Sequence, residues 1–268
     1  MPQRPSFLDL PPRGAKPRTS GITMVLDRGM PVPWVEPLLP VAGDAMDVWK
    51  MGWGTAYLEA DDAAKIDLLL RNGIRASTGG TLLENAWAQG KIDPFLDWAE
   101  AAGFPCVEVS NGSVGMAPSE KSRLIRRVAA RFTVLSEVGS KDPAALAVPV
   151  AWADEVARDL DAGATWVVAE GRESGTVGLY DPDGRVREGI VEAVLGVSTE
   201  RVVFEAPRKD QQAWLIRRLG PDVSLGNVAP TEVLGLEALR LGLRADTIGL
   251  TQPAGAAAGP GEAEALPW

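Results

Sequence analysis

The sequence predicts an α/β protein that folds as a single (β/α)8 (TIM) barrel. Eight short apolar runs alternate with eight longer amphipathic runs, and eight such units are the number that closes this barrel. Glycines follow four helical runs directly before a strand, where a left-handed residue commonly ends a helix. They are Gly73, Gly103, Gly163 and Gly220. An open, doubly wound sheet is the alternative arrangement of the same units.

The expected strands are short and mostly apolar, as in a parallel sheet buried on both faces. They cover residues 22–27, 46–51, 74–77, 106–110, 133–137, 166–170, 201–205 and 223–226. The expected helices carry apolar residues at helical spacing. They cover residues 32–41, 60–72, 82–102, 118–131, 150–161, 186–195, 210–219 and 230–241. The third helix is expected to break near Gly90, because glycine disfavours a helix interior.

The two ends of the chain differ in composition from the predicted barrel, which spans residues 19–250. Residues 1–18 form a Pro-rich, polar segment that predicts an extended arm, and residues 251–268 are an Ala/Gly/Pro-rich tail expected to be flexible. No run of about 18 apolar residues predicts a membrane span. The amino terminus lacks the apolar core of a signal peptide, so we expect a cytoplasmic protein.

Composition excludes several classes of chemistry. The 27 basic and 36 acidic residues give a net charge of −9, which argues against a nucleic-acid-binding protein. Histidine is absent, which excludes Ser-His-Asp triads and imidazole metal sites. Cys106 is the single cysteine of the sequence, so disulfides within the chain and thiolate clusters are excluded as well.

Carboxylates follow several of the expected strands, at the end of the barrel where active sites of this fold lie. We predict that these side chains point into the barrel mouth and bind Mg²⁺, a hard cation that prefers oxygen ligands. The candidate ligands are Asp27, Glu137, Glu170 and Glu205. The plain alternative is a set of structural ion pairs at the top of the barrel.

Cations and glycines occupy neighbouring strand ends and indicate anionic substrates. Lys50, Lys141, Arg172 and Arg208 could hold phosphate and carboxylate groups. Gly79, Gly80, Gly226 and Asn227 could offer backbone N–H groups at close approach. The remaining candidates for substrate binding are Arg28, Ser110, Asn111 and Ser174. Together these residues favour a small, multiply charged phosphate ester bound with Mg²⁺.

Nine motifs, spread over about residues 16–250, resemble the phosphosulfolactate synthase family in order and spacing. They read GITMVLDRG, KMGWGT, GGTLLE, VEVSNGS, VLSEVG, DAGATWVVAEGRESG, VVFEAP, LGNVAP and GLRADT. The resemblance implies a (β/α)8 barrel and a carbon–sulfur lyase of coenzyme M biosynthesis. Its reaction would be the Mg²⁺-dependent addition of sulfite to C3 of phosphoenolpyruvate, giving (2R)-phospho-3-sulfolactate.

The resemblance also implies roles for individual residues. Lys141 would be the general acid that protonates C2, and Lys50 and Arg172 would act with it on the anionic substrate. Asn111 and Ser140 stand where the family often has an acid and a lysine, which leaves open a homologue that adds a different nucleophile. A non-catalytic, stress-associated relative is the second alternative, and a homo-oligomer is left open.

Overall fold

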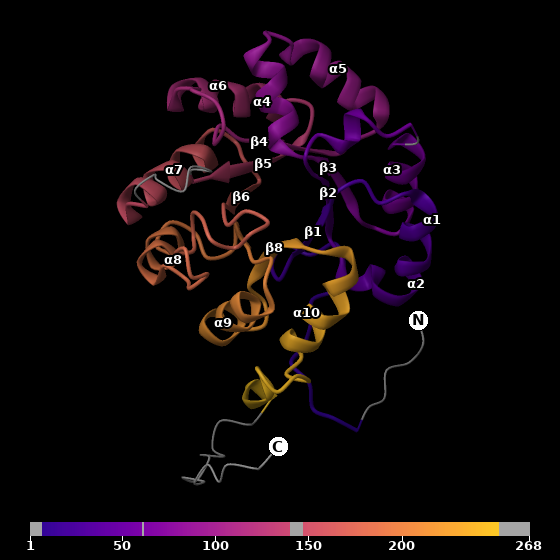
Figure 1. The fold of residues 1–268 in the computed structure, drawn as a ribbon, viewed down its shortest axis with the longest axis vertical. Coiled ribbons are helices and arrows are strands. Elements are labelled where there is room, and N and C mark those ends of the chain that lie inside the picture. Colours follow the sequence, from indigo (N-terminus) through magenta and orange to yellow (C-terminus); the bar gives the residue numbers. More distant parts are fainter. Residues whose placement is uncertain (1–6, 61, 140–146, 252–268) are drawn as a thin grey trace.

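Eight parallel strands close into a barrel in sequential order in the computed structural model, which describes residues 7–60, 62–139 and 147–251 (Figure 1). The strands are β1 (Thr23–Asp27), β2 (Val48–Met51), β3 (Arg75–Thr78), β4 (Cys106–Val109), β5 (Thr133–Val138), β6 (Trp166–Ala169), β7 (Val202–Glu205) and β8 (Ser224–Val228). Closure of β8 onto β1 confirms the predicted barrel and excludes the open sheet.

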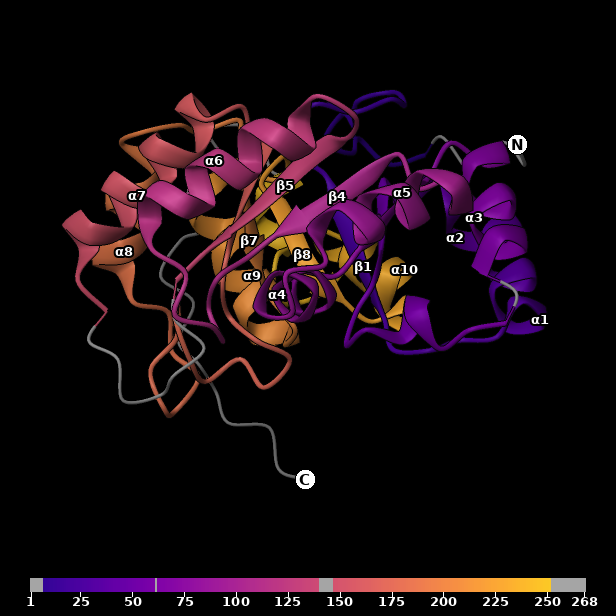
Figure 2. The same cartoon turned by 90° about the horizontal axis from the view of Figure 1, so that it is seen from above.

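Helices surround the barrel, as the two views show together (Figures 1 and 2). They are α1 (Val32–Val35), α2 (Leu39–Ala42), α3 (Asp62–Arg71), α4 (Gly80–Ala88), α5 (Ile92–Ala102), α6 (Pro118–Ala129), α7 (Pro149–Asp161), α8 (Glu188–Leu195), α9 (Lys209–Leu219) and α10 (Val233–Arg240). The chain divides as predicted near Gly90, which has a left-handed φ of 65° between α4 and α5.

The expected first helix, 32–41, is wrong as a continuous element. The structure has the short helices α1 and α2 there, joined by the 3₁₀ turn Glu36–Leu38. Pro37 and Pro40 lie within this stretch, and each lacks the N–H that an α-helix interior requires. The sequence pattern therefore located the helical region correctly but overestimated its regularity.

Side chains alternate between the inside of the barrel and the surrounding helices. One buried apolar cluster fills the barrel and is formed by Ile22, Met24, Val48, Leu135, Trp166, Val168 and Val203. A larger cluster, which includes Val25 and Trp49, packs the outer face of the strands against the helices. Since a strand repeats every two residues, this alternation decides which strand-end side chains can reach the mouth.

Four of the strand-end candidates follow an inward-facing residue at a spacing of two. The pairs are Val48 and Lys50, Leu135 and Glu137, Val168 and Glu170, and Val203 and Glu205. Each of these charged side chains therefore points inward, one layer above the apolar interior and at the carboxyl end of the barrel.

Asp27 has the opposite orientation, because it follows the outward-facing Val25 at the same spacing. Its Oδ2 accepts hydrogen bonds from Trp49 Nε1 at 2.8 Å and Lys65 Nζ at 2.9 Å. Its Oδ1 accepts from the backbone N–H groups of Gly29 and Met30 at 2.9 and 2.7 Å. The prediction that Asp27 faces the barrel mouth is therefore wrong; the side chain anchors the loop after β1 from behind.

The described part of the amino-terminal arm, residues 7–18, is tied to the opposite end of the barrel. Arg13 Nε pairs with Glu237 Oε1 of α10 at 3.2 Å, and Arg18 Nη1 pairs with Asp47 Oδ1 at 3.0 Å. These contacts leave the carboxyl end of the strands open. In the part of the chain that the structure describes, no helix is long and apolar enough to cross a membrane.

Replacing Lys65 by methionine is expected to destabilise the fold strongly. The ammonium group is fully buried between Asp27 and Glu59, and removing one partner of a buried ion pair costs about 3–5 kcal/mol because a charge is left uncompensated. The matched control on the same helix is Arg71→Met, since the Arg71–Asp67 pair is exposed. Its effect should stay within about 0.5 kcal/mol. Urea unfolding measures both losses, and equal losses would contradict the assignment.

Candidate active site

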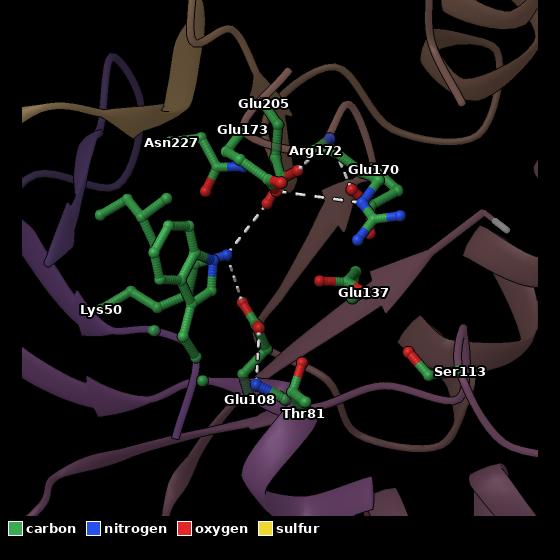
Figure 3. A pocket seen from close by; sticks show the side chains of 15 residues that line it. Lys50, Thr81, Glu108, Ser113, Glu137, Glu170, Arg172, Glu173, Glu205 and Asn227 are labelled. Carbon is green, nitrogen blue, oxygen red and sulfur yellow. Dashed lines mark hydrogen bonds and ion pairs between the residues drawn. The ribbon is translucent and has the colours of Figure 1, made fainter. Parts of the chain in front are cut away.

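A pocket of about 320 Å³ opens at the carboxyl end of the strands (Figure 3). Its walls come from strand ends and from the loops that follow them. The lining residues are Leu26, Lys50, Gly52, Trp53, Gly79, Gly80, Thr81, Glu108, Ser113, Glu137, Glu170, Arg172, Glu173, Glu205 and Asn227. Five of these are glutamates and two are cations, so the described lining is strongly acidic.

A buried ion-pair network lies on the floor of this pocket. The ammonium Nζ of Lys50 lies 3.1 Å from Glu108 Oε2 and 2.9 Å from Glu205 Oε1. All three side chains are almost completely buried, with at most 5% of each exposed. Figure 3 shows the two carboxylates approaching Lys50 from opposite sides. The lysine thus links β2 with β4 and β7.

The pKa values of this network follow from burial and charge. Burial by itself lowers the pKa of Lys50, but the carboxylates of Glu108, Glu205 and Glu137 outweigh it and hold that pKa well above its ordinary value. Burial raises the pKa of Glu108 to about 7, opposed by Lys50 and reinforced by Glu137 and Glu205. The pocket therefore holds a permanently charged lysine beside a carboxyl that takes up a proton near neutrality.

Glu205 also fixes the loop after β6. Its Oε2 accepts hydrogen bonds from the backbone N–H groups of Gly171 at 3.0 Å and Arg172 at 3.1 Å. The N–H of Arg172 also reaches Glu170 Oε1 at 2.6 Å. On the far side, the Tyr180 hydroxyl donates to the backbone oxygen of Glu205 at 2.5 Å. This arrangement holds Arg172 at the edge of the pocket.

Strained backbone concentrates at the same pocket. Among the described residues, the non-glycine residues with a left-handed φ are Trp53 at 56°, Arg172 at 54° and Asn227 at 55°. All three line the pocket. Such conformations cost free energy and cluster at functional sites, so their coincidence here supports the pocket as the active site.

The structure brings eight of the predicted site residues together. Lys50, Gly79, Gly80, Glu137, Glu170, Arg172, Glu205 and Asn227 all line the pocket. Gly80 shows why glycine is required at the start of α4, because a Cβ there would collide with Ser110 Oγ. Its N–H instead donates to Glu108 Oε1 at 2.8 Å, which connects α4 to the ion-pair network.

Several other candidates lie outside the lining. Ser110 Oγ donates to Glu84 Oε1 at 2.5 Å, Asn111 Nδ2 donates to the oxygen of Met116 at 3.2 Å, and Ser174 pairs with Thr176 at 2.9 Å. Gly226 faces the barrel interior, where a Cβ would meet Met24. Arg208 precedes α9 and its guanidinium lies against Gly184. Asp27 faces outward as described above, and the exposed Arg28 lies beside Trp53, which lines the pocket.

Lys141 and Ser140 lie outside the described residues. Conversely, the pocket includes residues that sequence reasoning missed, above all Glu108. A signal for it existed, because a glutamate in the middle of the apolar strand Cys106–Val109 is costly to bury without a partner. Trp53 is another of the residues missed, because the sequence analysis included it only as part of the KMGWGT motif.

The carboxylates fit a hard divalent cation by their chemistry. Glu137 and Glu170 line the pocket, and Figure 3 shows the Glu137 side chain pointing into it. Among residues 7–60, 62–139 and 147–251, no three acidic, histidine or cysteine side chains form a ready-made metal cluster. Mg²⁺ usually keeps several waters and takes one or two carboxylates together with substrate oxygens.

Comparison with known proteins identifies the family. The model of the (2R)-phospho-3-sulfolactate synthase family matches residues 11–246. The chain belongs to this family. Phosphosulfolactate synthase of Methanothermobacter thermautotrophicus is 42% identical over 246 residues, covering 89% of this chain and 95% of the relative. The Bacillus subtilis phosphosulfolactate synthase is 38% identical over 244 residues, covering 90% and 97%.

Solved structures support the fold alone. A 3-hexulose-6-phosphate synthase from Salmonella typhimurium has a TM-score of 0.52 at 15% identity, covering 82% of this chain and 98% of that structure. A 3-keto-L-gulonate-6-phosphate decarboxylase from Vibrio cholerae has a TM-score of 0.51 at 13% identity, covering 87% and 98%. Membership of the synthase family therefore identifies an enzyme of small-molecule substrates, and the barrel architecture agrees with it.

Replacing Glu108 by glutamine should change how stability depends on pH. Because the pKa of Glu108 is raised from 4.5 to about 7, the folded protein binds a proton there more tightly than the unfolded chain. The contribution of this carboxyl to the free energy of unfolding therefore falls as the pH rises through that window. Urea unfolding from about pH 5 to about pH 8 should show Glu108→Gln gaining stability relative to the wild type as pH rises. A constant difference, or a gain toward acid, would contradict the assignment.

Proposed function

We propose that this member of the synthase family adds sulfite to C3 of phosphoenolpyruvate in a Mg²⁺-dependent reaction and releases (2R)-phospho-3-sulfolactate. The observation that carries the proposal is the Lys50–Glu108–Glu205 network, which lies beside Glu137, Glu170 and Arg172 at the mouth of the barrel. A site of this composition suits a small substrate with several negative charges and an ion that neutralises the glutamates.

The reaction forms one carbon–sulfur bond and moves one proton. The sulfur lone pair of sulfite attacks C3, and the π electrons of the C2–C3 double bond move onto C2 and the carboxylate. A proton then adds to C2, and the phosphate ester stays intact. Negative charge develops at the substrate carboxylate during the attack. Fixed positive charge near that group therefore lowers the activation free energy of the addition step.

The described residues divide these tasks by position. Arg172 presents a guanidinium at the edge of the pocket, with 39% of its side chain exposed, which suits a charge-assisted contact with an incoming oxyanion. Lys50 is already shared by two carboxylates, so it orients an anionic group from the floor of the pocket. Gly79 and Gly80 line the pocket without side chains and so leave room for a phosphate to approach, while their N–H groups donate to the backbone oxygen of Met51 and to Glu108 Oε1.

Mg²⁺ would be held by Glu137 and Glu170, with Glu205 engaged by Lys50 and by backbone N–H groups. When bound, the ion supplies Lewis-acid stabilisation of negative charge on substrate oxygens. The described lining carries five carboxylates against two cations, so a bound divalent cation would reduce the repulsion of an anionic substrate.

Lys141, which lies outside the described residues, remains the proposed acid that protonates C2. A positioned lysine is one of the side chains that can transfer a proton as a general acid. No histidine exists in the sequence to take this role. Glu137 and Glu170, at the ends of the neighbouring strands, would face the same substrate.

Mass spectrometry of the products tests the proposal directly. Phosphoenolpyruvate, sulfite and Mg²⁺ should yield phosphosulfolactate, and either omission of sulfite or an excess of chelator should abolish it. A panel of other nucleophiles runs in parallel. Product formation with another nucleophile and none with sulfite would overturn the assignment of sulfite, and no product with any of them would favour a non-catalytic relative.

Two variants refine this assay. Arg172→Ala should raise the KM for phosphoenolpyruvate, since a charge-assisted hydrogen bond contributes roughly 1.5–3 kcal/mol. The control Arg185→Ala, at an exposed arginine of the same loop, should leave this KM unchanged.

Lys141→Arg keeps the charge but donates protons poorly. Its kcat should fall about 10²- to 10⁴-fold if Lys141 is the acid, and near-wild-type turnover would remove it from that role.

A further inference from the structure

Arg28 is an exposed cation that lies against a residue of the acidic pocket, the aromatic side chain of Trp53. Its guanidinium carbon lies 5.2 Å from the centre of the Trp53 ring. Among the described residues, Arg28 makes no salt bridge and no side-chain hydrogen bond, whereas Lys50, Lys65 and Lys121 are each paired with carboxylates. The contact with Trp53 orients the guanidinium without neutralising its charge.

The chain holds both members of this pair in place. Asp27 accepts hydrogen bonds from the N–H groups of Gly29 and Met30 and so fixes the loop that carries Arg28. The Gly52 N–H donates to the backbone oxygen of Asp27 at 2.8 Å, which draws the next loop toward the first. Trp53 follows directly, at the left-handed φ of 56°.

Trp53 is an unexpected residue for this position. Its side chain is 55% exposed and lines the pocket, although the lining is mainly charged and polar. A left-handed φ is unfavourable for a bulky residue, and an exposed indole gains little from burial. These costs are understandable if the ring has a role outside the hydrophobic core, and among the described residues the cation that lies over this ring is Arg28.

We propose that Trp53 is a positioning residue that holds the Arg28 guanidinium at the pocket rim, where Arg28 binds an oxyanion of a substrate. A guanidinium stacked on a ring keeps its N–H groups directed outward along its edges, in the geometry that matches carboxylate, phosphate or sulfite oxygens. The assignment of the ligand as one of these anions rests on the proposed function. Restricting the arginine beforehand lowers the entropy lost when the anion binds.

Lys50 and Arg172 hold positive charge at other positions of the pocket. Lys50 is shared between Glu108 and Glu205 on the buried floor, and Arg172 has its guanidinium near Glu173, with 3.9 Å between Nε and Oε2. Arg28 brings positive charge to the rim from the β1 side, where Trp53 holds it.

A double-mutant cycle tests the coupling between the two residues. Arg28→Gln should weaken binding of the anion roughly tenfold or more, because a charge-assisted contact is lost. Trp53→Leu should weaken it about 2- to 5-fold, the value of an exposed cation–π contact. In the Arg28→Gln background, Trp53→Leu should have no further effect, since the residue through which it acts is gone.

Calorimetric titrations of phosphoenolpyruvate and of sulfite, each with Mg²⁺ present, measure these affinities without turnover and show which anion Arg28 binds. Trp53→Phe should retain most of the affinity because it keeps the ring. Trp34→Leu is the control, since Trp34 is a comparably exposed tryptophan, 69% accessible, outside the pocket. It should leave both affinities unchanged.

The outcomes separate this inference from the proposed function. Equal losses from Trp53→Leu in the wild-type and Arg28→Gln backgrounds would overturn the inference, even if the enzyme makes phosphosulfolactate. A coupled cycle for either anion in a protein that makes no phosphosulfolactate would uphold the inference and overturn the proposed function. Failure of the wild-type protein to bind either anion would overturn both.

Discussion

The ammonium group of Lys50 lies 3.1 Å from Glu108 and 2.9 Å from Glu205, in a position where only 4% of the lysine is exposed. Charges buried this deeply are tolerated only in the company of opposite charges, so the three residues depend on one another. The network also extends outward: Glu108 receives the N–H of Gly80, and Glu205 receives those of Gly171 and Arg172. Removing the lysine would leave two carboxylates facing each other across the barrel.

The walls of the pocket follow from this network. Glu108 fixes the start of α4, and Glu205 fixes the loop after β6 that carries Arg172. A second layer of buried ion pairs supports the strand ends from outside. Lys65 holds Asp27 behind β1, and Lys121 donates to the backbone oxygen of Glu137 at 2.6 Å behind β5. Buried ion pairs therefore lie on both faces of the sheet, and those on the inner face form the floor of the acidic pocket.

The sequence was sufficient to predict the barrel, because eight repeated units and their glycine stops are local signals. It was also sufficient for Lys50, Glu137, Glu170 and Glu205, whose strand-end positions coincide with inward-facing residues. The sequence-based prediction failed at Asp27, because β1 ends on an outward-facing residue. Counting strand ends without following the two-residue alternation does not distinguish the inner face of the barrel from the outer face. Glu108 was missed because it lies within strand β4 and not after its end, although its side chain lines the pocket. Arg208 could not have been placed, because the direction of a loop side chain depends on contacts such as that with Gly184, which are distant in sequence.

The central claim is that an acidic pocket organised by Lys50 accepts an anionic substrate only together with a divalent cation. Calorimetric titration of phosphoenolpyruvate, with saturating Mg²⁺ and with excess chelator, tests this most directly. We expect Mg²⁺ to tighten phosphoenolpyruvate binding by about 5- to 150-fold, the usual range of coupling between two ligands, and phosphoenolpyruvate to tighten Mg²⁺ binding by the same factor. Equal affinity for phosphoenolpyruvate with Mg²⁺ and with chelator would contradict the claim.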